Sequence, residues 1–290
     1  MEFIDKVNGG ANGNAITDEI IKKIFPKPKT NHGTDPKKLW EKLKKHNRNL
    51  YRDMQEILLR EQNNRCCYCM KLLSDDDITI EHVIPKSTDD QAIFDEYMNC
   101  MPNFKGYVEL SKQFLNIPHH STPPYPLIYA YYNLTASCKG VTFISGAKQK
   151  SQSCNNFRND KFITPMMFYS DIKQQFEYYE DGEAKWPNEP NEEPSIVVLG
   201  LNDNMLKMIR RMWFGIQEHP NRPTKSDLAS YTDSKRQEMI SYLIGVLFKN
   251  DSSYTSDLDI LNTFKNETYW NIFLKYDYFQ NVKPRQKNNP

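Results

Sequence analysis

The sequence predicts an α+β protein, because two kinds of periodicity occupy different parts of the chain. Apolar residues recur at helical spacing over 39–61 and again over 206–216. Residues 78–82 alternate as in a strand, and an Asp-Gly pair divides a predicted hairpin at 176–186. We therefore expect a small strand-containing core, flanked by an N-terminal helical segment and a mostly helical C-terminal lobe.

The composition favours a folded chain outside the membrane. Aromatic residues make up 12% of the 290 residues, which excludes disorder for the bulk of the chain. The longest apolar runs, at 196–199 and 242–248, are too short to span a bilayer. The first six residues carry acids where a signal peptide needs a basic start, so we expect a cytoplasmic protein.

The first half of the chain contains one long helical pattern and one strand pattern. Residues 1–35 predict a mostly irregular arm with an amphipathic stretch at 16–25. A helix then begins at Asp35-Pro36, with Asp as N-cap, and reaches Glu61, with Asn47 as a candidate break. Residues 72–85 predict a strand, a turn and a second strand. The insertion that follows, 88–131, is rich in Pro, Tyr and His.

The second half is predicted to be mainly helical. Asn202 is the expected N-cap of the helix that runs to Ile216. Further helical patterns cover 227–248 and 256–276, and a basic tail follows at 282–290. The expected domains are a basic arm and helix (1–60), a core (61–165) and a hairpin with a helical lobe (166–290).

Charge is distributed in two opposite blocks, although the net charge is only +1. Residues 22–52 contain 11 Lys or Arg against two acids, a balance of +9. Residues 171–204 contain nine acids against two Lys, a balance of −7. The basic block fits a polyanion such as nucleic acid, and the acidic block fits a protein partner. Either block alone is equally compatible with solvated helix faces.

The cysteines have the spacing of a metal site. Cys66 and Cys69 have the two-residue gap that allows both thiolates to bind one tetrahedral zinc ion. Cys67 could replace Cys66, but the one-residue gap between Cys67 and Cys69 is less suited to binding one metal ion. The available second pair is Cys138 and Cys154, whose 15-residue spacer must fold back to close the site. Cys100, which stands apart, is expected to be a small buried apolar residue.

The pair Glu81-His82 is the strongest candidate for catalysis. Adjacent residues of a regular strand point to opposite faces, so a shared site requires a strand end, where the chain turns toward Pro85. There a carboxylate can hold a hard divalent cation while an imidazole activates water.

These features together resemble the HNH, or ββα-metal, endonucleases, and most closely the PtuB-type HNH proteins of Septu and retron-associated anti-phage systems. The resemblance covers roughly residues 36–215. It rests on a basic helix before Cys-x-x-Cys, on the motifs Glu-His-x-x-Pro-Lys-Ser and Tyr-x-Asn-Leu-x-x-Ser-Cys, and on a spaced Cys-Asn-x-x-Lys/Arg. An acidic hairpin before a Leu-x-Leu-Asn segment with a following helix completes the pattern. The matching segments are 60–69, 81–87, 131–138, 154–158 and 198–211.

The resemblance implies a role for each matching residue. Glu81 corresponds to an acidic ligand of a catalytic Mg²⁺ or Mn²⁺, His82 to the general base, and Asn133 to the asparagine that pins the loop between two strands. Asn155 corresponds to the second metal ligand, with Asn156 and Asn159 as alternatives. Arg158 and Lys86 would contact phosphate. The implied ligands of a structural zinc ion are Cys66, Cys69, Cys138 and Cys154.

The function that the resemblance implies is metal-dependent hydrolysis of phosphodiester bonds, with DNA favoured over RNA. The chain would be the nuclease effector of an anti-phage defence complex with a PtuA-type ATPase. The acidic block and the apolar helices predict that residues 166–290 dock this partner, with apolar anchors such as Trp186, Trp213 or Trp270. Two alternatives stay open. One is a non-catalytic nucleic-acid-binding module held together by zinc, and the other is a stand-alone HNH restriction or homing nuclease.

Overall fold

The computed structural model describes residues 1–6, 10–24, 36–85, 108–109, 125–143, 150–159, 161–187, 194–248 and 255–276, with single residues at 92, 95, 97 and 99. Lys86, Cys100, the predicted tail 282–290 and most of the insertion lie outside these residues. The chain divides into two compact units: 1–67, 73–138 and 159–173 form the first, and 68–72, 139–158 and 174–290 the second. The three predicted domains stay a prediction.

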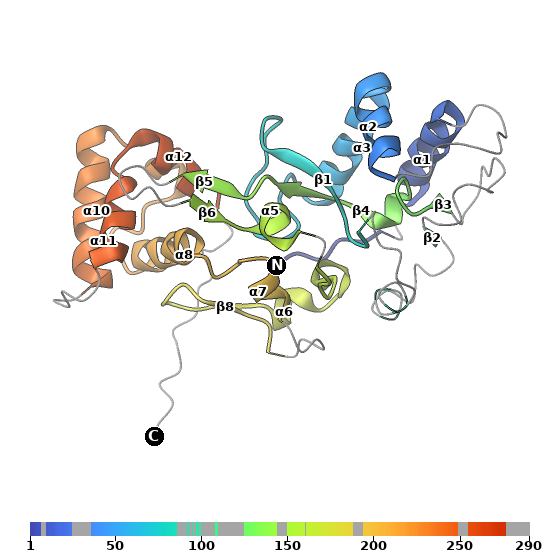
Figure 1. Ribbon diagram of the computed structural model, residues 1–290. Helices are drawn as coiled ribbons and strands as arrows, with labels where there is room; N and C mark the ends of the chain where they lie inside the picture. The colour runs from blue at the N-terminus through green and yellow to red at the C-terminus, as the bar shows by residue number, and fades with distance from the viewer. Residues whose placement is uncertain are drawn as a thin grey trace. The chain divides into compact units, whose positions relative to one another are not determined.

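The first unit begins with helices α1 (Gly10–Ile24), α2 (Pro36–His46) and α3 (Arg48–Glu61), which pack on one another (Figure 1). The predicted break at Asn47 is confirmed. The predicted irregular arm is too long, because α1 starts at Gly10. A Cβ atom on Gly13 would lie 2.2 Å from the Tyr131 ring, so the glycine is needed for close packing. Because glycine is a poor helix former, it weakens the helical pattern in the sequence at the place where α1 packs against Tyr131.

The sheet at the centre of the first unit joins distant segments. Strand β1 (Ile78–His82) pairs antiparallel with β4 (Leu134–Cys138), and α3 packs against both. The strand–turn–strand prediction for 72–85 is therefore wrong, since only β1 forms a strand there and its partner comes some 50 residues later. The other edge of β4 is bound by Gln62, whose amide donates to Ala136 O at 2.7 Å and accepts from Ala136 N at 2.7 Å.

Short elements complete the first unit. Strands β2 (Val108–Glu109) and β3 (Tyr125–Pro126) pair in parallel. The 3-10 turn η3 (Tyr131–Asn133) leads directly into β4, and a second such turn, η4 (Met166–Phe168), follows the predicted core. The backbone N–H of Ile4 donates to Met167 O at 2.8 Å, which ties the N-terminal residues to η4.

The second unit contains two hairpins and several short helices. Strand β5 (Val141–Phe143) pairs antiparallel with β6 (Lys150–Gln152), and α5 (Cys154–Arg158) follows. The second hairpin pairs β7 (Glu177–Tyr178) with β8 (Ala184–Lys185). In the chain, α6 (Ile172–Gln175), which spans the border of the two units, precedes this hairpin, and α7 (Ser195–Val198) follows it. The predicted hairpin is thus confirmed, and its Gly182 has φ +83° with Lys207 O only 2.2 Å from where a Cβ would lie.

The remaining helices are α8 (Asn204–Gln217), α9 (Lys225–Ala229), α10 (Asp233–Leu247), α11 (Thr255–Thr263) and α12 (Glu267–Leu274). Each of the two helical patterns predicted after 226 is divided in two, because Thr232 and Asn266 cap new helices. The cap of α8 is Asp203, which accepts from Met205 N at 2.8 Å. Asn202, the predicted cap, instead accepts a hydrogen bond from Ala184 N at 2.8 Å in β8.

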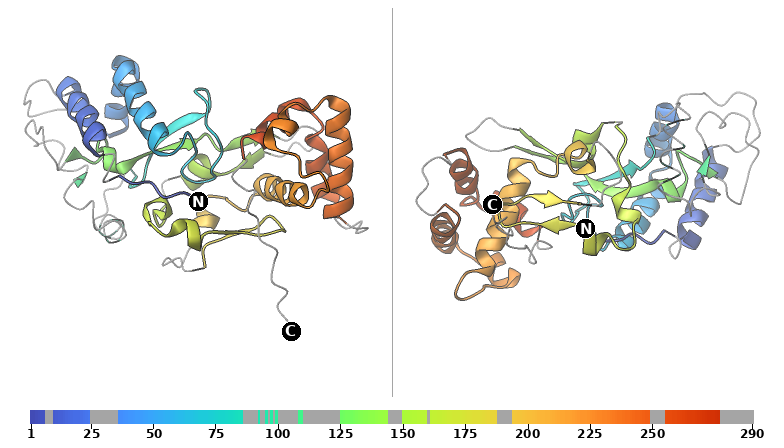
Figure 2. Two further views of the ribbon diagram at one scale, coloured as in Figure 1. Left: turned by 180° about the vertical axis from the view of Figure 1, so that it is seen from behind. Right: turned by 90° about the horizontal axis from the view of Figure 1, so that it is seen from below.

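Helices α8, α10 and α11 pack together, as do α9 and α12, and Figure 2 shows this orange-to-red group from two further sides. Its core includes the tryptophans predicted as partner anchors. Trp213 stacks on Phe273 at 4.7 Å, and Trp270 Nε1 donates to Leu228 O at 2.8 Å. Trp186 is also buried. The prediction that these three rings anchor a partner is therefore wrong, because they stabilise the chain's own fold.

Candidate metal centre and candidate active site

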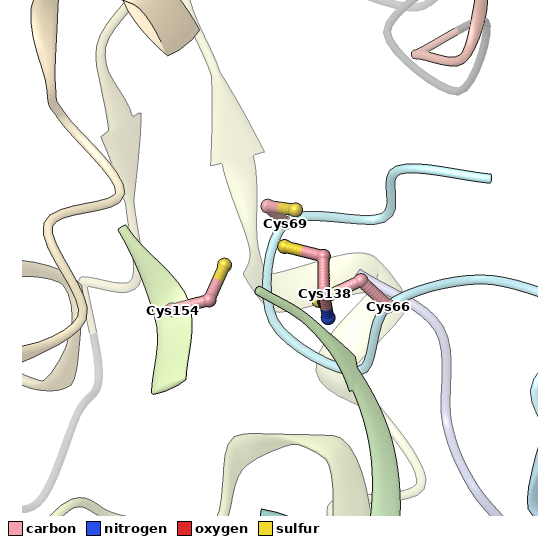
Figure 3. Close-up of side chains that lie close together, drawn as sticks. All are labelled: Cys66, Cys69, Cys138 and Cys154. Atoms are coloured by element: carbon pink, nitrogen blue, oxygen red, sulfur yellow. Dashed lines mark hydrogen bonds between the residues drawn. The ribbon is translucent and has the colours of Figure 1, made fainter. Parts of the chain in front are cut away.

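Four cysteine side chains gather at one place in the structure. Their sulfur atoms all lie within 4.8 Å of one another, and all four residues are buried. Figure 3 shows these side chains, which come from the turn before residue 70, the end of β4 and the start of α5: Cys66, Cys69, Cys138 and Cys154. In the described part of the chain this is the one group of three or more His, Cys, Asp or Glu side chains that could hold a metal ion.

The Cys-x-x-Cys segment forms a tight turn. The backbone N–H of Cys67 donates to Ala136 O at 3.0 Å, which fixes the start of the turn beside β4. Met70, directly after the turn, has φ +62°, a left-handed conformation that bends the chain back. The backbone N–H of Cys138 donates to Cys66 Sγ at 3.3 Å, so this sulfur accepts a hydrogen bond from the segment that carries another cysteine.

The long spacer between Cys138 and Cys154 is closed by the β5–β6 hairpin. Val141 pairs with Gln152, and Ser153 N donates to Gly140 O at 2.8 Å, so the chain leaves and returns at the same place. Gly140 has φ +62°, and a Cβ atom there would lie 1.8 Å from Ser153 O. The predicted return of this spacer is confirmed, and glycine is required where its two ends meet.

The structure distinguishes the two adjacent cysteines. Cys67 is buried but lies outside the four-cysteine group, and its Sγ donates to Thr135 Oγ1 at 3.4 Å. Burial raises the pKa of the Cys67 thiol well above its usual value, which keeps it protonated. Cys66 is therefore the candidate ligand and Cys67 is a neutral neighbour.

The candidate catalytic pair lies where β1 ends. Glu81 faces Thr135 in the register and His82 faces Leu134, after which the chain bends at residues 83–84. Both side chains are largely buried, with 6% of each residue exposed. The predicted position of this pair at a strand end is confirmed, and its chemistry stays a prediction.

Contacts from different parts of the first unit hold the His82 ring. Its Nε2 atom lies 3.1 Å from the carbonyl oxygen of Ile128, and its ring meets Trp40 of α2 edge-to-face at 4.5 Å. A carbonyl oxygen can only accept a hydrogen bond, so Nε2 carries the proton of the neutral ring and the lone pair is on Nδ1. Tyr129 stacks on Trp40 at 6.2 Å and donates its hydroxyl to Leu39 O at 2.9 Å.

Asn133 clamps the loop that follows the pair. Its Oδ1 accepts from Ile84 N at 2.7 Å, and its Nδ2 donates to Ile84 O at 3.0 Å and to Leu127 O at 3.1 Å. The buried amide therefore binds Ile84, two residues after His82, and Leu127, directly before the Ile128 carbonyl that contacts the His82 ring. These bonds match the loop-pinning role that the resemblance implies for Asn133.

The three candidate asparagines of the second unit and its border differ in their surroundings. Asn155 is half-buried on the first turn of α5. The Asn156 amide donates to Lys139 O, and this contact ties it to the chain after Cys138. Asn159 is exposed and has φ +55°. Asn155 remains the candidate ligand, and it belongs to the second unit whereas Glu81 and His82 belong to the first.

The predicted phosphate contacts have no support among the described residues. Arg158 is fully buried, with 0% exposed, and its Nη1 donates to the Tyr68 hydroxyl at 3.1 Å. A side chain in this position would have to move to meet a substrate. Lys86 lies outside the described residues.

Two residues of these sites were missed by the sequence analysis. The helical pattern places Trp40 only on the apolar side of a helix, and the cysteine spacing places Tyr68 only inside the Cys-x-x-Cys turn. Each position offered a signal. Trp40 lies on the buried face of α2, and Tyr68 lies between the candidate ligands Cys66 and Cys69. Only the contacts with His82 and Arg158 reveal what each side chain does.

The described part of the chain is thus an α+β protein with a candidate four-thiolate metal centre. No protein-family model matches this chain, and no curated protein or solved structure is similar enough to it to count as a match. Among the described helices, none is both long and apolar enough to cross a membrane.

Proposed function

We propose that this chain is a metal-dependent HNH endonuclease that hydrolyses phosphodiester bonds, with DNA rather than RNA as substrate. The observation that carries the proposal is the Glu81-His82 pair at the end of β1, with the following loop clamped by Asn133. A buried carboxylate beside an imidazole of defined orientation is suited to acid–base chemistry at a phosphate.

His82 is the proposed general base. The hydrogen bond from Nε2 to Ile128 O leaves the lone pair on Nδ1, where it can take a proton from an attacking water molecule. Trp40 restricts the ring by edge-to-face packing. Asn133 restricts both the segment after His82, through Ile84, and the segment before Ile128, through Leu127. The imidazole is therefore held in one orientation before substrate binds, which lowers the entropic cost of the reaction.

Glu81 and Asn155 are the proposed ligands of a catalytic Mg²⁺ or Mn²⁺. Carboxylate and amide oxygens are the hard donors that these ions prefer, so the residue types fit. When bound, such an ion neutralises charge on the phosphate oxygens. Glu81 serves this purpose only while it is ionised, which leaves the proton transfer to His82. Lys86 stays a proposed phosphate contact.

A structural Zn²⁺ is the proposed occupant of the four-cysteine group. Thiolates about 2.3 Å from a tetrahedral zinc ion lie about 3.8 Å from one another. The sulfurs here, all within 4.8 Å and all buried, fit that arrangement. Four thiolates leave no open coordination position, so the role of this ion would be to stabilise the fold rather than to activate water.

The proposed biological role is that of a cytoplasmic nuclease in a bacterial anti-phage complex with a PtuA-type ATPase. This part rests on the sequence resemblance. The acidic segment around the β7–β8 hairpin, with Glu177, Glu180, Asp181 and Glu183 all partly exposed, suits a basic partner surface. Co-purification with an ATPase would separate this role from that of a stand-alone nuclease.

The function is tested by incubating the purified full chain with plasmid DNA and with RNA, with and without added Mg²⁺ or Mn²⁺. Cleavage of DNA that requires the added ion supports the proposal. The isosteric variant Glu81→Gln should keep the fold and the zinc content and lose most of the metal-dependent cleavage. Tight DNA binding without cleavage by the wild type would instead support the alternative, a non-catalytic nucleic-acid-binding module held together by zinc. The basic face of α2 is compatible with that alternative too.

The basic face of α2 and the start of α3 should supply affinity for the phosphate backbone. Lys42, Lys45 and Arg48 are exposed and Lys44 is also accessible to solvent, while Leu43 on the opposite face is buried. Replacing all four basic residues with Gln should weaken DNA binding and flatten its salt dependence, by about 0.9 in log–log slope for each phosphate that is no longer neutralised. Binding is measured by fluorescence anisotropy at several salt concentrations.

A matched control removes four positive charges elsewhere, through Gln at Lys161, Lys225, Lys235 and Lys265, all of which are at least partly exposed. This control should leave the slope nearly unchanged. Equal slopes for the two quadruple variants would show that the α2 face is only a solvated surface.

A further inference from the structure

The buried arginine of α5 lies one helical turn after a candidate metal ligand. Cys154 begins α5 and Arg158 ends it, four residues later, so this short helix connects the two residues directly. Arg158 is completely buried and its Nη1 donates to the Tyr68 hydroxyl at 3.1 Å. Tyr68 is itself 1% exposed. A guanidinium in such a position is costly unless other charges or dipoles compensate for it.

Tyr68 directly precedes another candidate ligand. Because Tyr68 and Cys69 are adjacent in the turn, the bond from Arg158 links the segment that carries Cys154 to the segment that carries Cys69. The backbone is constrained at both ends of this link, with φ +57° at Cys154 and φ +62° at Met70. The Cys154 N–H also donates to Leu199 O at 2.7 Å, which fixes the start of α5.

We propose that Arg158 and Tyr68 form a clasp around the cysteine metal centre, which holds Cys154 and Cys69 at ligand distance and places a positive charge beside the thiolates. The proposal rests on the zinc site proposed above and assigns Arg158 to that site rather than to the substrate phosphate. Both are positioning residues, since they act through the cysteines.

The charge of the occupied centre gives this arrangement a physical reason. Four thiolates around one Zn²⁺ carry a net charge of about −2, which is unfavourable in a buried site without positive neighbours. Arg158 supplies one such neighbour. Groups beyond the direct ligands orient those ligands and tune metal affinity, and their loss commonly weakens binding about 10–100-fold.

A second buried arginine supports the same picture. Arg210 of α8 is 1% exposed, and its Nη2 donates to Leu201 O at 2.6 Å. Burial lowers the pKa of Arg210, and the opposing interactions with nearby acidic groups include Cys69 and Cys154. The Arg210 guanidinium of the second unit therefore lies within electrostatic range of Cys69 and Cys154, which would be thiolates in the zinc-bound protein.

The test compares zinc affinity among full-length variants by competition with a chromophoric chelator. Arg158→Met should weaken zinc binding about 10–100-fold, and Tyr68→Phe should act in the same direction, because each removes one side of the same hydrogen bond. Arg158→Lys, which keeps the charge, should restore part of the affinity. The double variant Arg158→Met with Tyr68→Phe should be no weaker than the worse single variant, as expected for one shared contact.

Tyr129→Phe is the matched control, since Tyr129 is also buried and its hydroxyl also makes a hydrogen bond, to Leu39 O. It should bind zinc like the wild type. Co²⁺ substitution gives a second readout, because the ligand-field spectrum of tetrahedral cobalt thiolate should change in the clasp variants and stay unchanged in the control. Tyr68→Phe keeps the ring and therefore tests the clasp even where Arg158→Met fails to fold.

Unchanged zinc affinity in Arg158→Met and Tyr68→Phe would overturn the clasp while leaving the zinc site intact. Weaker cleavage at low substrate concentration, together with unchanged zinc affinity, would return Arg158 to the phosphate-contact role. A folded wild type that contains no zinc would overturn the metal site itself, and the clasp with it.

Discussion

Replacing His82 with alanine is expected to lower the rate of DNA cleavage by about 10²–10⁴-fold, which is the usual contribution of a general base. The physical reason is the loss of the Nδ1 lone pair that accepts the proton of the attacking water, while the proposed metal ligands remain. Cleavage is measured under single-turnover conditions at saturating DNA, so that a change in binding does not enter the rate.

The effect on folding should be small by comparison. His82 is the last residue of β1, and the clamp by Asn133 on Ile84 does not involve the imidazole. Zinc content and thermal unfolding should therefore stay close to the wild-type values. His219→Ala is a suitable control, because this histidine also packs edge-to-face on an aromatic ring, Tyr242 at 4.4 Å, in the second unit. Near-normal cleavage by nuclease-free His82→Ala protein would reject the assignment.

Replacing Cys69 with serine is expected to impair folding, not only cleavage. Loss of one thiolate opens the proposed zinc shell, and structural zinc sites supply about 10–16 kcal/mol of binding free energy in small zinc-finger peptides. The variant should be insoluble or sensitive to protease, and its soluble fraction should contain less than one zinc ion per chain. The measurements are limited proteolysis and elemental analysis.

Cys67→Ser provides a closely matched control. Cys67 is also buried and only two positions away, but it lies outside the four-cysteine group, and serine can keep the hydrogen bond to Thr135. This variant should retain zinc and protease resistance. A folded wild type with much less than one zinc ion per chain would show that the four cysteines are not a zinc site. A Cys69→Ser variant that retains zinc and protease resistance, as Cys67→Ser should, would show that Cys69 is no ligand.

Local signals in the sequence predicted several elements correctly for physical reasons that act over a few residues. The break at Asn47, the end of β1 at His82 and the hairpin around Gly182 all depend on turn chemistry or on short-range periodicity. The candidate ligand pair Cys66 and Cys69 also depends on local spacing. These features could be predicted because each is determined by neighbouring residues.

Errors arose where a local pattern was compatible with two environments. Glycine near the N-terminus predicted an irregular arm, yet Gly10 and Gly13 allow α1 to approach two tyrosine rings closely. Asn202 and Asp203 are both residue types that cap helices well. Asp203 caps α8 because the Asn202 side chain is already hydrogen-bonded to Ala184 of β8. In each case a contact with a distant segment decided between two locally acceptable states.

By itself the sequence determined the residue types and the local geometry of both candidate sites: a Cys-x-x-Cys turn, a carboxylate and an imidazole at a strand end, and a basic helix. The tertiary structure decided which distant segments complete them. Strand β4 became the partner of β1, the β5–β6 hairpin returned Cys154 to the other cysteines, and Arg158 was buried against Tyr68 rather than exposed to substrate. Such pairings depend on burial and on hydrogen bonds between residues far apart in the chain, which no local spacing encodes.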